Sequence, residues 1–168
     1  MKKTVILLLT LALLAAGLAG CGPSKAEAEF RAELRELRSS ASQADSEFFY
    51  VCVNIRNYMR ENGITANDNA KEFVPQVFDL YPNVTMDQVT DDLNRMNAAL
   101  EILNNNNWGN KHAPEMIELA NDLVYSVRQI GVCIVHPKGT PEEYKKQYNE
   151  YDDRAFYDIE AIDEYLNN

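Results

Sequence analysis

Apolar side chains recur at every third or fourth position through the first long segment of the chain, and charged side chains lie between them. The repeating positions are Phe30, Leu34, Leu37, Ala41, Ala44, Phe48, Val51, Ile55 and Tyr58. Steps that alternate between four and three residues form the heptad pattern of a helix that packs along another helix. The pattern predicts a long N-terminal helix, which we expect to end at the favourable pair Asn62-Gly63.

A second, shorter helix is predicted over about residues 67–80. Asn67 or Asp68 would cap its start, because a short polar side chain can accept a hydrogen bond from the first turn. Pro75 lies inside this segment and has no backbone N–H to donate. The helix therefore either begins near Pro75 or kinks there.

The spacing of Thr85 and Gln88 predicts the start of a third helix. A threonine followed by glutamine three residues later is the capping-box pattern. Apolar residues at helical spacing continue from there to Leu103. The asparagine-rich stretch 104–110 then predicts a loop, which holds the only tryptophan of the chain, Trp108.

Two further helices are predicted in the C-terminal part of the chain. One starts near Pro114 and is apolar over a broad arc as far as Ile130, after which residues 131–135 favour β-structure and either fray or extend it. The other starts at Thr140, with threonine as the cap, proline at the first helical position and Glu143 at the third, as in a capping box. The fold class is therefore all-α: one helical domain, residues 25–168, with a bundle of about five helices.

The first twenty residues have the organisation of an export signal. Lys2 and Lys3 precede an apolar run from Val5 to Ala19, and small residues follow. This run of about 15 residues is shorter than the ~20 that a transmembrane helix needs. We therefore expect the segment to direct export rather than to anchor the chain as a helix.

The tetrapeptide Leu18-Ala19-Gly20-Cys21 resembles the lipobox of bacterial lipoproteins. The resemblance implies that residues 1–20 are removed, that Cys21 carries a diacylglycerol and a further acyl chain such as palmitate, and that residues 21–24 form a short tether. Two or more acyl chains give stable membrane attachment. Because Gly22 rather than aspartate follows the cysteine, the resemblance also implies the outer membrane in a Gram-negative host. An ordinary secretory signal with an incidental cysteine is the alternative.

The charge of the chain is acidic and uneven. The 16 basic and 26 acidic side chains give a net charge of −10, which argues against binding nucleic acid through a basic patch. Residues 142–168 hold nine acidic side chains and three basic ones. This segment is either a solvated helix face or a docking surface for a basic protein partner. In the second case Glu160, Asp163 and Glu164 are the candidate contacts.

Two cysteines, Cys52 and Cys133, remain when the lipobox cysteine is set aside. In an oxidising envelope compartment a single remaining pair is most simply a disulfide. We therefore expect one disulfide to close the bundle, with two separate buried thiols as the alternative.

The sequence offers no recognisable catalytic or metal-binding pattern. Its two histidines, His112 and His136, lack the spacing of a zinc site. The adjacent pairs Asp91-Asp92 and Asp152-Asp153 would point to different faces of a helix, so neither forms an acid/base pair by itself. We expect no enzymatic activity, no catalytic residues, no metal and no cofactor.

These observations predict a non-catalytic lipoprotein of the bacterial cell envelope, attached to the membrane through Cys21, that binds an envelope or secreted protein as an accessory or scaffold subunit. One alternative is an inhibitor or immunity lipoprotein that occludes a secreted toxin or hydrolase, with Trp108 as a plug. Another is a small-ligand carrier with an interhelical pocket lined by Tyr144, Tyr148 and Tyr151.

Overall fold

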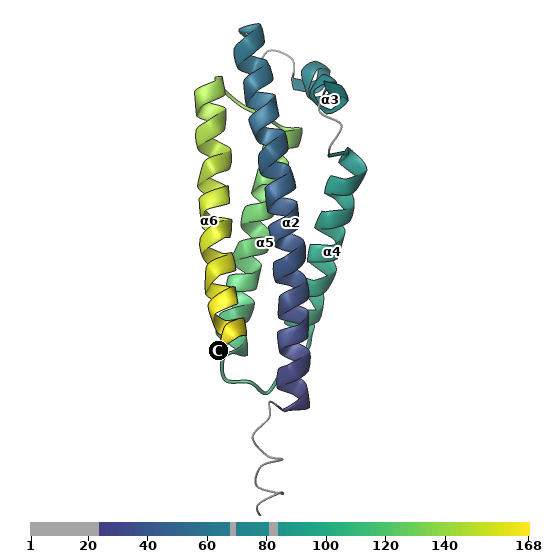
Figure 1. Ribbon diagram of the computed structural model, residues 1–168, viewed down its shortest axis with the longest axis vertical. Coiled ribbons are helices and arrows are strands. Elements are labelled where there is room, and N and C mark those ends of the chain that lie inside the picture. The colour runs from purple at the N-terminus through teal and green to yellow at the C-terminus, as the bar shows by residue number, and fades with distance from the viewer. Residues whose placement is uncertain (1–23, 68–69, 81–83) are drawn as a thin grey trace, which may run out of the picture.

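Four long helices and one short helix make up the computed structural model, which describes residues 24–67, 70–80 and 84–168. The helices are α2 (Lys25–Asn62), α3 (Ala70–Leu80), α4 (Met86–Asn105), α5 (Ala113–Val135) and α6 (Pro141–Asn167). Helices α2, α4, α5 and α6 lie side by side along the long axis of the molecule, and α3 lies at one end between α2 and α4 (Figure 1). The all-α prediction is confirmed, and the described residues contain no strand.

Helix α2 is the central member of the bundle, because it packs against α4, α5 and α6. Its 38 residues span about 57 Å at 1.5 Å per residue. Every predicted heptad position from Phe30 to Ile55 is buried. The helix ends as predicted at Gly63, whose φ of 62° is the left-handed conformation that glycine adopts without strain.

Both predicted capping boxes are present. Thr85 Oγ1 accepts from the Gln88 backbone N–H at 3.2 Å, and Gln88 Oε1 accepts from the Thr85 N–H at 2.8 Å. Thr140 and Glu143 exchange the same two hydrogen bonds at 3.3 and 2.8 Å. These boxes fix where α4 and α6 begin.

The two segments that the sequence left open are both helical. Helix α3 begins at Ala70 and contains Pro75, so it starts before the proline. The Asn67 side chain accepts from the Gly139 N–H at 3.4 Å, and the other candidate cap, Asp68, lies outside the described residues. Residues 131–135 extend α5, because burial of Ile134 and its neighbours outweighs their β-propensity.

The expected disulfide is corrected by the structure. Cys52 and Cys133 are both buried free thiols, which was the alternative. The Cys52 Sγ–H points at the backbone carbonyl of Ile130, 3.9 Å away, rather than at the other sulfur. The packing of α2 against α5 therefore brings the cysteines into one region of the core without pairing them.

The lipobox cysteine Cys21 and the predicted signal segment lie outside the described residues. Ser24 is the first described residue, and its Oγ caps α2 by accepting from the Glu27 N–H at 3.1 Å. None of the described helices combines the length and the apolar character that crossing a membrane requires.

Candidate functional site

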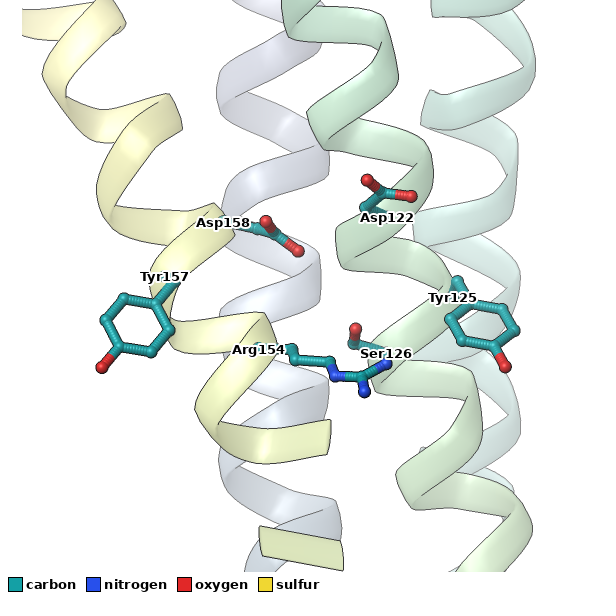
Figure 2. Close-up of a pocket in the computed structure, with 6 residues that line it drawn as sticks. All are labelled: Asp122, Tyr125, Ser126, Arg154, Tyr157 and Asp158. Atoms are coloured by element: carbon teal, nitrogen blue, oxygen red, sulfur yellow. The ribbon is translucent and has the colours of Figure 1, made fainter. Parts of the chain in front are cut away.

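Helices α5 and α6 run antiparallel, and a groove opens along the seam between them. Asp122, Tyr125 and Ser126 of α5 and Arg154, Tyr157 and Asp158 of α6 line a hollow of about 380 Å³ in this groove (Figure 2). In each helix the lining residues are one turn apart, so they stack on the side that faces the neighbouring helix. We call this hollow the α5–α6 groove.

Two carboxylates face the α5–α6 groove from opposite sides. Asp158 extends from α6 toward α5, and Asp122 lies on α5 across from it (Figure 2). Neither has an ion-pair or hydrogen-bond partner among the described residues. Partial burial, together with the negative charge of Asp122, raises the pKa of Asp158 to about 6. At neutral pH the Asp158 side chain is therefore mostly ionised, and a cation bound beside it would offset the repulsion from Asp122.

The hydroxyl of Ser126 lies in the same groove. This residue is only 2 % exposed, and its side chain makes no hydrogen bond to any described residue. A serine inside a helix commonly donates to the carbonyl one turn earlier, as Ser46 does to Ser42 O at 3.0 Å. Ser126 instead presents its oxygen toward the gap between the two helices, on the side where the Arg154 guanidinium lies (Figure 2). The groove therefore has a hydroxyl that can bond to a ligand without breaking a hydrogen bond to a described residue.

Arg154 also lines the groove, but its charge is already paired. Its guanidinium donates to Glu150 Oε1 at 2.6 Å and lies 5.8 Å from the centre of the Tyr151 ring. Tyr125 and Tyr157 lie at the outer edges of the groove, where their side chains are 52 % and 69 % exposed. The groove is thus an acidic slot bordered by exposed aromatic rings.

A second hollow of about 480 Å³ follows the first along the same seam. Leu119 of α5 and Ala161 of α6 line it, each about one turn from the acidic pair. Glu115 and Glu164 add two more carboxylates, and Arg31 and His112 lie at the same end. The acidic seam therefore extends from the middle of α6 toward its C-terminal end.

The three acidic residues predicted as partner contacts occupy different environments. Glu160 is exposed on α6, and Glu164 is exposed and lines the second hollow. Asp163 forms an ion pair with Arg38 of α2, so its charge is used within the bundle. Only Glu164 therefore belongs to the α5–α6 seam.

Trp108 packs into the end of the core. It is 8 % exposed, its ring centre lies 5.3 Å from that of Phe30, and its indole N–H donates to Leu103 O at 2.9 Å. In this position the indole covers core residues and offers little surface to a partner.

The three predicted pocket tyrosines are mainly core residues. Tyr144 and Tyr148 are fully buried with ring centres 5.3 Å apart, and Phe49 packs on Tyr148 at 5.5 Å. Burial raises the pKa of Tyr148 to about 12. Tyr151 is half-buried and touches Tyr125 of α5 at 6.4 Å between ring centres. This arrangement is dense packing rather than an open cavity.

No part of the described chain brings together three or more histidine, cysteine, aspartate or glutamate side chains that could hold a metal ion. His112 precedes α5 and His136 follows it, so a helix of 23 residues separates the two histidines.

Sequence reasoning missed Asp122, Ser126 and Asp158. A signal was present, because Ser126 and Asp122 interrupt an otherwise apolar arc of α5 at a spacing of one turn. The partner position on α6 could not be found in that way, since it depends on how the two helices are aligned.

Comparison of the chain with protein-family models, with curated proteins and with solved structures found no match. The function is therefore argued from the geometry and the charge of the groove.

Proposed function

We propose that this protein is a non-catalytic, lipid-anchored lipoprotein of the bacterial cell envelope that binds another protein through the α5–α6 groove. The observation that carries the proposal is the pair of carboxylates, Asp122 and Asp158, which line one open groove and form no ion pair with a described residue. A basic partner would supply the missing charge, and complementary charge favours both encounter and specificity.

The proposed anchor comes from the lipobox resemblance at Cys21. Helix α2 begins at Lys25, so only residues 22–24 separate the cysteine from the bundle. So short a tether would hold the bundle close to the bilayer. The outer membrane is the proposed location if the host is Gram-negative.

The anchor would also set the distance of the groove from the membrane surface. The start of α2 and the end of α6 lie at the same end of the bundle (Figure 1). Asp158 lies nine residues before Asn167, or about 14 Å along the helix axis. A partner bound there would be near the membrane surface.

Binding fits the groove better than catalysis does. Acid and base groups gain catalytic strength in enclosed sites from which water is excluded. The α5–α6 groove is instead bordered by exposed side chains such as Tyr157. Exposed tyrosines beside a charged slot are typical of surfaces that contact other proteins.

Photocrosslinking in intact cells tests the proposal. A photoreactive amino acid would replace Tyr157 at the edge of the groove, and the matched control would replace the exposed Glu101 of α4. We expect one dominant protein to be captured from position 157, to be absent from position 101, and to be lost in a Cys21→Ala variant. Equal capture at both positions, or no capture at position 157, would contradict a protein-binding groove.

A further inference from the structure

The α5–α6 groove combines features that together define a ligand chemistry. Asp122 and Asp158 supply carboxylate oxygens from two helices, and Ser126, a residue that is 2 % exposed, lines the same groove with a hydroxyl that makes no hydrogen bond to the described chain. The hydroxyl is an observation independent of the acidic pair, because the Ser126 side chain is almost fully enclosed and yet makes no hydrogen bond to a described residue. A ligand that bonds to Asp122, Asp158 and Ser126 would balance the charge of the acidic pair and give the hydroxyl a hydrogen-bond partner.

The net charge of the groove is negative. Glu150 neutralises Arg154 through its hydrogen-bonded ion pair, so Arg154 adds no free positive charge beside Asp158. The remaining charges are those of Asp122 and Asp158. The preferred ligand is therefore a cation with several hydrogen-bond donors.

We propose that the groove binds the ammonium group of a lysine side chain in a basic segment of the protein partner. This inference rests on the proposed function. The three N–H donors of the ammonium would bond to Asp122, Asp158 and the Ser126 hydroxyl. The tyrosines, whose rings extend away from the gap between the helices (Figure 2), would contact the residues that flank the lysine.

Lysine fits this site better than arginine does. An ammonium is a compact charge whose three donors point in different directions, which suits acceptors on opposite walls and between them. A guanidinium is planar and favours two parallel bonds to one carboxylate. Here the acceptors come from two helices, and Arg154 already occupies one end of the slot.

A divalent metal ion is the main competing cation. It would have only the oxygens of Asp122, Asp158 and Ser126 as ligands from the groove, with the guanidinium of Arg154 nearby. Such ions prefer six or more oxygen ligands, water included. The experiment below therefore includes calcium as a competitor.

The experiment titrates the full-length lipidated protein, in a neutral detergent at pH 7.5 and fixed salt, with a labelled peptide of alternating lysine and alanine. Two matched peptides carry acetyllysine or arginine in place of lysine. We expect the lysine peptide to bind at least about tenfold more tightly than the acetylated one, because a charged hydrogen bond is lost on acetylation. The arginine peptide should bind more weakly than the lysine peptide.

Matched variants separate the site from general surface charge. Asp122→Asn and Asp158→Asn should each weaken binding about tenfold, and Ser126→Ala, which changes no charge, about threefold. The control Asp153→Asn removes the same charge from the exposed face of α6 and should change the affinity less than twofold. Circular dichroism would establish that each variant is folded, and the exposed Asp122 offers a test that leaves the core untouched.

Several results would overturn the lysine site. These are equal losses for Asp153→Asn and Asp158→Asn, unchanged binding of the acetylated peptide, tighter binding of the arginine peptide, or displacement of the lysine peptide by 1 mM calcium at constant ionic strength.

The failure of this site and the failure of the proposed function give different results. Undiminished capture of the cellular partner from position 157 in the Asp122→Asn and Asp158→Asn variants would reject the lysine site and leave protein binding intact. No capture from the unmodified groove would reject protein binding. The peptide titration would still show whether the α5–α6 groove prefers a lysine side chain.

Discussion

Two helix seams of this bundle each contain a pair of acidic side chains, and they differ in where the balancing cation comes from. Between α2 and α4, Glu47 lies near the buried Asp92, and Arg95 forms an ion pair with Asp92. Between α5 and α6, Asp122 and Asp158 have no such partner, because the nearby Arg154 pairs with Glu150 instead. The bundle thus supplies its own cation at one seam and leaves the other open to a cation from outside.

The contrast shows that an acidic pair is not by itself a binding site. Burial and the neighbouring Asp92 raise the pKa of Glu47, just as burial and Asp122 raise the pKa of Asp158. What distinguishes the α5–α6 seam is that its arginine, Arg154, pairs with Glu150 and not with either member of the acidic pair.

Among the variants considered, removal of Arg95 should have the largest effect. It would leave the acidic pair of the α2–α4 seam without a cation, as in the α5–α6 seam, but with the Asp92 carboxylate buried. Asp92 would remain buried beside Glu47 with no cation. We expect Arg95→Ala to lower the free energy of unfolding, because the Asp92 side chain is only 4 % exposed and would lose the cation that balances its charge. Urea unfolding followed by circular dichroism measures the change.

The control for this prediction is Arg35→Ala, which removes an exposed arginine from α2. It should cost less than about 0.5 kcal/mol. If the two variants lost the same stability, the α2–α4 ion pair would have no special role.

A third acidic pair, Asp45 of α2 and Asp152 of α6, tests what happens when an acidic pair is more enclosed. One oxygen of Asp45 is buried without a partner, and burial followed by the charge of Asp152 raises the pKa of Asp45 to about 7. Because the folded state holds this proton more tightly than the unfolded state, the contribution of Asp45 to stability falls as pH rises from about 4 to about 7.

We therefore expect Asp45→Asn to raise the free energy of unfolding at pH 8 by about 1–2 kcal/mol and to have little effect at pH 4. Urea unfolding across this pH range measures the difference. Glu118→Gln removes one exposed charge from α5 and serves as the control. The same gain at both pH values would show that Asp45 is not protonated in the folded state.

The sequence was sufficient for the helices because their signals are local. The heptad from Phe30 to Ile55 and the capping boxes at Thr85 and Thr140 each act within one helix, and each is found where it was predicted. The disulfide prediction failed for the opposite reason. Counting cysteines indicates a possible pair, but the direction in which Cys52 points depends on how α2 packs against α5.

The candidate site could be predicted from the sequence only in part, because it too depends on how two helices pack. An acidic surface on the last helix was predicted from charge, and Glu164 does lie on the α5–α6 seam. Asp122 and Asp158 are 36 positions apart in the sequence, and the side-by-side alignment of two antiparallel helices brings them together. That alignment is set by the shapes of the packed side chains, which periodicity alone does not specify.

Acidification should weaken the binding of the lysine peptide by about tenfold between pH 7.5 and pH 5. The pKa of Asp158 is about 6, so protonation removes one of the two charges over this range. The other charged groups lining the groove are Asp122 and Arg154. Titrations at four pH values would measure the change, and Asp158→Asn should give weak binding with a much smaller dependence. A profile of the same steepness in that variant would assign the effect to other groups.

The smallest predicted effect on peptide affinity comes from a variant in which Arg154 is free to pair with Asp158 in the α5–α6 seam. Glu150→Gln would release Arg154, which lies one turn before Asp158 on the same face of α6 and can then pair with it. The groove would come to resemble the α2–α4 seam, and the lysine peptide should bind about threefold more weakly, in line with the modest strength of an exposed ion pair. Removing the competitor in the double variant Glu150→Gln, Arg154→Gln should restore binding to at least the original level. If Glu150→Gln alone did not change the affinity for the lysine peptide, then Arg154 would not compete with the peptide for Asp158. The two seams would then differ in how their helices are arranged, and not in which carboxylate pairs with the arginine.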